Sequence, residues 1–169
     1  MVTRVIEVQD LTPAAYDGKF GQIIKDQPTY EPLADNENLV YWSKIVDLEK
    51  QMDHYVSLLV EKKRPIELVV MERHTKCQEF FIPTSGECVM FFAPGKNPDD
   101  PDEHPDPNEI VCFNMHCEGM LGYVIDRGTW HYPAYPLTET AGQMIIMRNN
   151  LEHDDVQLRD LPEPITVKL

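Results

Sequence analysis

Four ionisable side chains in two separate stretches could together carry metal or acid–base chemistry: Glu72, His74, Glu79 and His131. Glu72 and His74 follow an apolar segment and, because alternate residues of a strand share a face, should point the same way. A hairpin-like return would bring Glu79 beside them, and His131 follows a turn at Gly128. Two imidazoles and two carboxylates suit a divalent transition metal such as Ni, Mn, Fe or Zn better than Ca or Mg.

The same residues also allow plainer interpretations. A Glu-x-His pair on a strand can simply face solvent, and His131, which stands between two aromatic residues, could be a hydrogen-bonded core histidine. If no metal binds, His131, His74 and Glu79 are the candidate catalytic acid–base groups, with His131 the first choice.

Three neighbouring residues have predicted roles of their own. Arg73 alternates with Glu72 and His74, so we expect it on the opposite face of the strand, in a structural salt bridge. Arg127 carries a forked guanidinium that could bind a substrate carboxylate or equally pair with one of the many acidic residues. Trp130 adjoins His131, and we expect it to shape the pocket wall and contact the substrate.

Short strands are the elements that must position these groups. Prolines and glycines divide the chain into apolar segments of 4–5 residues at 68–71, 88–92, 110–113 and 144–147, with weaker candidates at 39–46, 56–60, 79–82 and 122–125. Such spacing predicts an all-β sandwich, jelly roll or barrel. Thr12 followed by Pro13 predicts a short N-terminal helix, because threonine caps a helix and proline fits its first position.

One acidic, proline-rich segment, residues 97–109, interrupts this pattern. Residues 97–107 contain four prolines, five acidic residues and no lysine or arginine. We expect a solvated loop between two strands. Calcium binding is the alternative, although the spacing fits no EF-hand loop.

Length and charge limit the class of protein. The 169 residues predict a single domain over 1–169, with an N-terminal helix and outer strands in 1–50 and a core in 66–150. A net charge of −14 argues against nucleic-acid or anionic-membrane partners, and no apolar run is long enough to cross a bilayer. The N-terminus lacks a signal-like apolar region, and the four cysteines have no CxxC spacing, so we expect reduced thiols in the cytoplasm.

The two stretches resemble the two cupin motifs. Glu72-x-His74, then Glu79 and Gly86, is similar to the first motif, with glutamate in the position of the first histidine. Residues 126–131, with a glycine at 128 and a histidine at 131, are similar to the second motif, with an aspartate in place of proline.

The chain more closely resembles the ureidoglycolate lyase family. The resemblance rests on the Glu-Arg-His block at 72–74, Phe-Ile-Pro at 81–83, and Trp-His-x-Pro at 130–133, with weaker agreement at 20–24 and 105–113. It implies a cupin-type double-stranded β-helix, a homodimer, and a reaction that converts (S)-ureidoglycolate into glyoxylate and urea, in purine and allantoin nitrogen catabolism. Metal ligation by Glu72, His74, Glu79 and His131 would assist the reaction.

The chain is a divergent member, because Thr75, Glu79 and Thr84 replace the family's usual Pro, Gln and Met. The extra negative charge of Glu79 could tighten metal binding or change the substrate. The alternative functions are therefore another metal-dependent cupin enzyme, an isomerase or dioxygenase acting on a small hydroxy or keto acid, and a cupin that binds a small ligand without catalysis.

Overall fold

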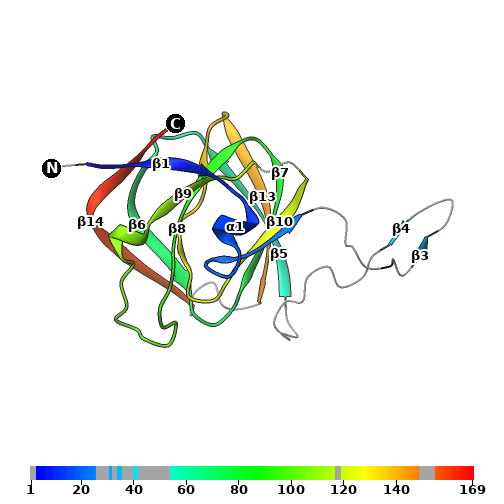
Figure 1. Cartoon of the computed structure of the whole chain (residues 1–169), viewed down its shortest axis with the longest axis horizontal. Helices are drawn as coiled ribbons and strands as arrows, with labels where there is room; N and C mark the ends of the chain where they lie inside the picture. The colour runs from blue at the N-terminus through cyan, green and yellow to red at the C-terminus, as the bar shows by residue number, and fades with distance from the viewer. Residues whose placement is uncertain are drawn as a thin grey trace.

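The computed structural model describes residues 3–25, 54–116, 119–148 and 155–169, together with a few positions between 31 and 41. Within these residues, almost all regular structure is β, arranged in two main sheets (Figure 1). The larger sheet contains, in spatial order, β11 (Trp130–His131), β6 (Glu67–His74), β14 (Val156–Lys168), β1 (Arg4–Asp10), β9 (Val111–Asn114), β8 (Cys88–Ala93) and β12 (Tyr135–Pro136). The smaller sheet contains β2 (Gly21–Lys25), β10 (Met120–Ile125), β7 (Glu79–Ser85), β13 (Thr140–Arg148) and β5 (His54–Lys62). A separate two-stranded pair joins β3 (Ala34–Asp35) to β4 (Val40–Tyr41).

The larger sheet closes on itself through β11. This short strand pairs with β6 on one side and with β8 on the other. The closure encloses a core cluster that includes Leu68, Met71, Phe91 and Trp130. A second cluster lies against the smaller sheet and contains several aromatic residues, among them Tyr16, Phe20, Phe92 and Tyr123.

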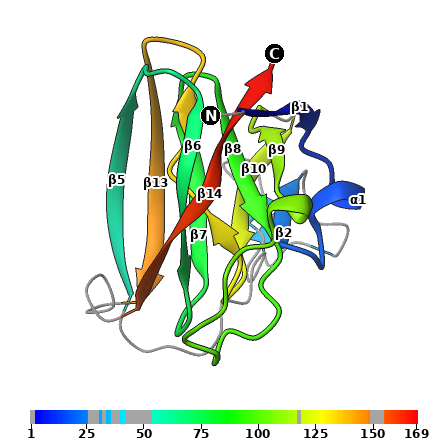
Figure 2. The same cartoon turned by 90° about the vertical axis from the view of Figure 1, so that its left-hand side faces the viewer.

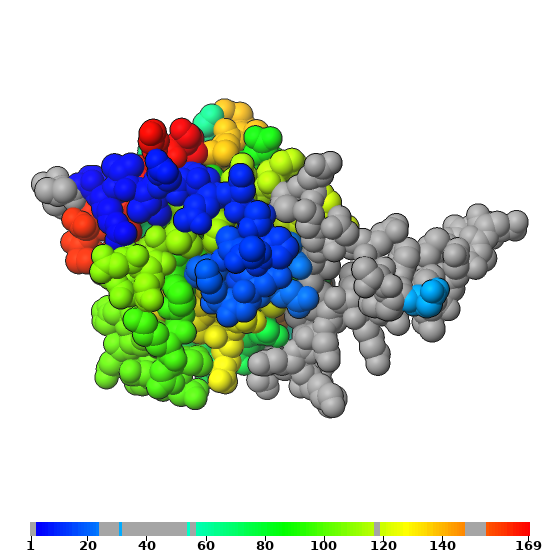
Figure 3. Space-filling model, in the orientation of Figure 1, coloured from blue at the N-terminus to red at the C-terminus, as the bar shows by residue number. Residues whose placement is uncertain are grey.

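Helical structure is limited to α1 (Pro13–Tyr16) and a single 3-10 turn at Pro107–Glu109 in the described residues. The hydroxyl of Thr12 accepts a hydrogen bond from the Ala15 amide, and proline occupies the first turn, as predicted. The buried Tyr16 ring anchors α1, because its hydroxyl donates to the carbonyl of Val124 at 3.0 Å. In the space-filling view, β1 and α1 form one blue surface on the face toward the viewer (Figure 3).

The two ends of the chain meet in the larger sheet. β1 pairs in parallel with β14, so the termini lie on the same side of the molecule (Figures 1 and 2). Strand β1 falls within residues 1–50, where outer strands were expected without bounds, and β14, which follows the predicted core of 66–150, was not predicted. In β14, Pro162 and Pro164 argued against a strand in the sequence, because proline has no backbone N–H to donate to a neighbouring strand. Both lie between Asp160 and Ile165, where the register with β6 shifts.

The predicted all-β jelly roll with a short N-terminal helix is confirmed. Seven of the eight segments proposed from sequence coincide with described strands, and the eighth, 39–46, lies outside the described residues apart from β4. None of the described helical segments is long and apolar enough to span a membrane. Cys77, Cys88 and Cys112 are buried cysteines, and Cys117 lies outside the described residues.

Candidate functional site

Glu72, His74, Glu79 and His131 come together in one cluster. Glu79 lies between the imidazoles: its Oε1 is 3.5 Å from Nε2 of His74, and its Oε2 is 3.0 Å from Nε2 of His131. Oε1 of Glu72 is 3.8 Å from the same His131 nitrogen. The two imidazole rings stack, with centroids 5.7 Å apart and an interplanar angle of 26°. The convergence expected from the two sequence stretches is therefore present in the structure.

Three strand termini create this convergence. Glu72 and His74 lie on the last residues of β6, and Glu79 is the first residue of β7. His131 pairs directly with Glu72 through β11. In Figure 2 this is the lower end of the molecule, where β6 ends and β14 begins. His74, Glu79 and His131 are buried, whereas the Glu72 side chain is 22% exposed and is the most accessible member of the cluster.

A glycine turn holds the second stretch against the first. The Gly128 amide donates to the carbonyl of His74 at 2.7 Å. Gly128 has a φ of 85°, and a Cβ there would lie 2.8 Å from Cβ of Pro98. Only glycine combines this backbone conformation with such a close approach at little cost. The turn thus fixes the distance between His74 and His131.

His131 is held in a defined orientation and carries extra positive character. Its Nδ1 lies 3.0 Å from the carbonyl of Thr129, so Nδ1–H donates there and Nε2 faces the carboxylates. Burial alone lowers the pKa of His131, but Glu79 and then Glu72 outweigh burial and raise the pKa to about 9. Without a bound cation, His131 is therefore an imidazolium between two carboxylates at neutral pH.

The Glu79 carboxylate is the anion that pairs with the His131 imidazolium. Burial raises the pKa of Glu79, but the nearby His74 and His131 together outweigh burial, and the net pKa lies below its usual value. Despite the 3.0 Å approach of His131, Oε2 of Glu79 has no well-aligned hydrogen bond, and the buried Nδ1 of His74 also has none. Buried polar atoms are usually satisfied, so such exceptions require a structural or functional reason.

This donor set fits a divalent transition metal. Ligand atoms of Glu72, His74 and His131 lie within 4.8 Å of one another. Glu79 does not belong to this mutually close group, although its Oε2 is unsatisfied and lies 3.0 Å from Nε2 of His131. Mixed imidazole and carboxylate sites of this kind bind first-row transition ions. The metal-ligand and catalytic roles of the four residues remain predictions.

Arg73 and Trp130 lie on the opposite side of these strands. Arg73 is fully buried, its Nη1 is 2.9 Å from Oε2 of Glu103, and its guanidinium stacks 4.6 Å from the Trp130 ring centre. The predicted structural salt bridge of Arg73 is confirmed. Trp130, predicted to shape the pocket wall and contact the substrate, is fully buried in the core cluster enclosed by the larger sheet. Because adjacent strand residues face opposite ways, its ring lies across the strand from the imidazole of His131. A contact between Trp130 and substrate remains a prediction.

Arg127 is exposed on the second-motif turn, and its predicted contact with a substrate carboxylate remains a prediction. The turn is braced on both sides of Arg127. Oδ1 of Asp126 accepts a hydrogen bond from Nε2 of Gln78 at 2.7 Å, and the hydroxyl of Thr129 donates to the carbonyl of Phe20 at 3.1 Å. The aspartate that departs from the cupin motif therefore has a structural role.

The acidic loop is anchored to the fold as well as solvated. Glu103 accepts hydrogen bonds from the amides of Lys96 and Asn97 and forms the salt bridge to Arg73. Burial raises the pKa of Glu103, but these amides and then Arg73 outweigh burial and lower it. The predicted exposed loop between two strands is confirmed, since residues 97–109 lie between β8 and β9 and are mostly exposed.

Sequence reasoning missed Asp155. This residue precedes β14, is 1% exposed, and has Oδ2 3.7 Å from Nδ1 of His74. In the sequence it follows His153 and Asp154 and resembles part of a solvated acidic tail. No local signal identifies it, because its contact with His74 spans about eighty residues of chain and depends on the pairing of β14 with β6.

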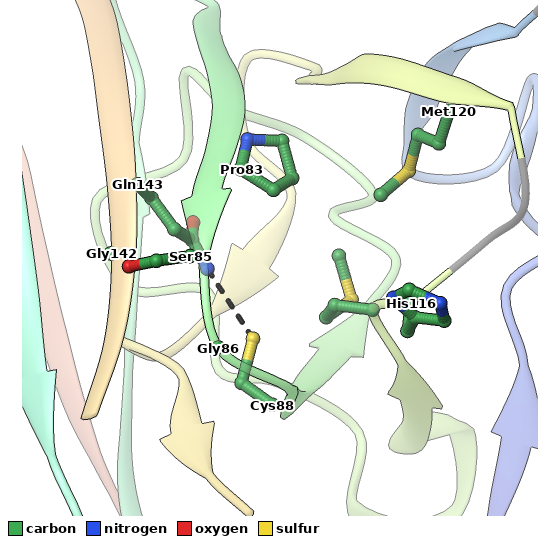
Figure 4. A pocket seen from close by; sticks show the side chains of 9 residues that line it. Pro83, Ser85, Gly86, Cys88, His116, Met120, Gly142 and Gln143 are labelled. Atoms are coloured by element: carbon green, nitrogen blue, oxygen red, sulfur yellow. Dashed lines mark hydrogen bonds between the residues drawn. The ribbon is translucent and has the colours of Figure 1, made fainter. Parts of the chain in front are cut away.

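Among the described residues, a cavity lies at the C-terminal end of β7, whereas the four-residue cluster lies at its N-terminal end. It has a volume of about 130 Å³ and is lined by Ser85, Cys88, His116, Met120 and Gln143, among others (Figure 4). The Gln143 amide donates to Sγ of Cys88 at 3.6 Å, and burial raises the pKa of this thiol to about 11. The cavity is therefore lined by a protonated thiol, the thioether of Met120 and several polar side chains.

A family model described as ureidoglycolate lyase matches residues 3–168. A search of curated proteins gives no match.

Similar solved structures include CapF with the inhibitor 3-isopropenyl-tropolone (17% identity, TM-score 0.46, covering 66% of this chain and 30% of that chain). Another is the TDP-quinovose 3,4-ketoisomerase WlaRB from Campylobacter jejuni (15% identity, TM-score 0.46, covering 80% of this chain and 89% of that chain). A third is the sugar 3,4-ketoisomerase QdtA from Thermoanaerobacterium thermosaccharolyticum (17% identity, TM-score 0.44, covering 80% of this chain and 85% of that chain). The chain thus spans 30% of the length of CapF and most of the length of the two ketoisomerases.

Proposed function

We propose that this chain, which belongs to the ureidoglycolate lyase family, cleaves ureidoglycolate into glyoxylate and urea. The observation that carries the proposal is the family match over residues 3–168, nearly the whole chain. This match favours the lyase over the two alternatives considered from sequence, a different metal-dependent cupin enzyme and a binding protein without catalysis.

The reaction needs two proton transfers and one stabilised anion. The substrate hydroxyl loses its proton, its oxygen forms the new C=O bond, and the C–N bond breaks with its electron pair going to nitrogen. That nitrogen gains a proton and leaves as urea. Positioned acid and base groups contribute about 10²–10⁴-fold to such a step.

The cluster contains groups suited to both transfers. We assign His131 Nε2 as the proton donor to the departing nitrogen, because the carboxylates of Glu79 and Glu72 keep a proton there. We assign the pair formed by Glu79 and His74, 3.5 Å apart, as the acceptor of the hydroxyl proton. Arg127, exposed on the adjacent turn, is the proposed partner of the substrate carboxylate.

In a metal-bound form, with Nε2 of His131 deprotonated, Glu72, His74 and His131, with Glu79 as a proposed fourth ligand, would instead hold a divalent metal, of which Ni, Mn, Fe and Zn are the candidates. His131 would then be a ligand, and its role as proton donor applies to the metal-free form. When bound, such an ion supplies a Lewis acid that lowers the pKa of the substrate hydroxyl and stabilises the alkoxide. The chain's own contribution is to bury the donors and exclude water, because three of the four side chains are less than a tenth exposed.

We also propose a homodimer in the cytoplasm that serves purine and allantoin nitrogen catabolism. Support for a dimer comes from exposed apolar side chains on the edge strand β5 and its neighbour β13: Leu58 is 67%, Val60 52% and Met144 36% exposed, and Met144 pairs with Leu58. Contiguous apolar surface of this kind often marks a protein interface. The buried thiols are consistent with a reducing compartment.

The experiment is an assay of urea and glyoxylate released from (S)-ureidoglycolate by wild type and His131→Ala at matched metal loading. We expect equimolar products from wild type and a loss of at least ~10³-fold in kcat/KM for the variant, a free-energy change of ~4 kcal/mol in the transition state. Equal rates would overturn the role of His131, and no release by wild type would overturn the proposed reaction.

A further inference from the structure

Asp155 is a buried carboxylate whose two oxygens have different partners. Its Oδ1 accepts three hydrogen bonds from one turn: from the Thr75 amide at 2.7 Å, the Lys76 amide at 2.6 Å, and the Thr75 hydroxyl at 3.1 Å. Its Oδ2 accepts from Sγ of Cys77 at 3.3 Å and lies 3.7 Å from Nδ1 of His74. The Oδ1 contacts fix the carboxylate, and the fixed carboxylate presents Oδ2 to the imidazole.

His74 connects this carboxylate to the four-residue cluster. Its Nδ1 is buried, has no aligned hydrogen-bond partner among the described residues, and faces Oδ2 of Asp155, while its Nε2 faces Glu79. Carboxylates thus lie near both ring nitrogens, at 3.7 Å from Nδ1 and 3.5 Å from Nε2. When a cation in the cluster takes the Nε2 lone pair, the ring proton is on Nδ1 and Asp155 is its acceptor. Metal-binding histidines commonly depend on such an outer carboxylate, which fixes ring orientation and tautomer.

We propose that Asp155 is a positioning residue that accepts the His74 Nδ1 proton, so that Nε2 can offer its lone pair to a metal bound in the cluster. This inference rests on the proposed function, because the orientation of Nε2 matters only if that nitrogen binds a metal or substrate. Asp155 does not touch the substrate and acts only through His74.

A second metal site at Asp155 is the competing interpretation, because donor atoms of His74, Cys77 and Asp155 also lie within 4.8 Å of one another. The hydrogen bonds argue against it. Oδ1 is already occupied by three donors, and Oδ2 accepts from the Cys77 thiol, which would have to lose its proton to bind a cation. The geometry is that of a satisfied carboxylate that orients a neighbour.

Asp155→Asn tests the proposal with almost no change in shape. The amide oxygen takes the Oδ1 position, because three donors converge there, and the NH2 group then faces Nδ1 of His74. A donor at that place forces neutral His74 to carry its proton on Nε2 and blocks the lone pair. Asp160→Asn is the matched control, since it removes the same charge from an exposed position on β14.

Two measurements report on this change without substrate. The first is nitrogen NMR of Zn²⁺-loaded protein with labelled histidine, with the His74 ring assigned by comparison with His74→Gln. The second is the affinity for Co²⁺, measured by competition with a chelator. We expect His74 bound through Nε2 with its proton on Nδ1 in wild type and Asp160→Asn, loss of that state in Asp155→Asn, and Co²⁺ affinity reduced about 10- to 100-fold only in Asp155→Asn.

Absence of the Nε2-bound, Nδ1–H state of His74 in Zn²⁺-loaded wild type would overturn the proposal, and this result does not depend on whether the variant folds. Unchanged tautomer and Co²⁺ affinity in folded Asp155→Asn would overturn it as well. Because neither measurement uses ureidoglycolate, failure of the positioning role is distinguishable from failure of the lyase activity, which shows only as absent urea release by wild type.

Discussion

The two faces of β6 and β11 bury charged groups in opposite ways. On one face, the Arg73 guanidinium donates to Gln157 and to loop carbonyls, pairs with Glu103 and stacks on Trp130. On the other face, His74 and Glu79 each bury a polar atom that lacks an aligned hydrogen bond. Because neighbouring residues of a strand point to opposite sides, the same few residues of β6 and β11 build both faces.

The contrast separates stability from function. A buried charge whose hydrogen bonds are all made is accommodated in the folded state, is costly to disturb on one side only, and leaves nothing to bind a ligand. A buried group with unused bonding capacity costs stability, and proteins retain such groups mainly at functional sites. We therefore assign the face of Arg73, Trp130 and Glu103 to stability and the face of Glu72, His74, Glu79 and His131 to chemistry.

The largest expected effect on stability comes from the satisfied face. Arg73→Ala leaves the Glu103 carboxylate without its cation and removes the stack on Trp130, so the free energy of unfolding should fall by ~3–5 kcal/mol. Urea denaturation measures this loss. The double variant Arg73→Met with Glu103→Gln should recover much of it, because both charges are removed together. A loss below ~1 kcal/mol for Arg73→Ala would mean that the pair behaves as a surface ion pair.

The pH dependence of stability should come from the unsatisfied face. In metal-free protein the pKa of His131 is raised to about 9, so folded protein holds a proton there that the unfolded chain releases near 6.5. The contribution is fully present below about pH 6.5 and is lost as the pH rises through about 9, at most ~3 kcal/mol.

Unfolding free energies measured across this range test the slope. Glu79→Gln removes the main partner that raises the pKa of His131, so its profile should be nearly flat. Glu139→Gln, at a side chain that is 92% exposed, should keep the wild-type slope. A wild-type profile without a decline between these pH values would contradict the charge state assigned to the cluster.

Strand periodicity carried most of what the sequence predicted. Alternation along 72–74 placed Glu72 and His74 together and Arg73 opposite, and the structure has this arrangement. The same rule applied to Trp130 and His131 also puts them on opposite faces, so the burial of Trp130 was predictable from its position, although its adjacency to His131 suggested otherwise.

The features that the sequence could not predict depend on contacts between segments far apart in the chain. Asp155 reaches His74 only because β14 pairs with β6, and the two prolines of β14 conceal that strand from a local pattern. The partner of Arg73 likewise comes from a loop with a composition typical of solvated segments. Among acidic residues that resemble one another in sequence, only the fold determines which become buried, like Asp155, or partly buried in an ion pair, like Glu103.

Co²⁺ binding to metal-free protein tests most directly whether the unsatisfied face holds a metal. Calorimetric titration should give one ion per chain in wild type, at least ~100-fold weaker binding in His131→Ala, a difference of ~2.7 kcal/mol, and wild-type affinity in Glu103→Gln, which alters only the satisfied face. No binding by wild type, or equal affinity in wild type and His131→Ala, would contradict the account.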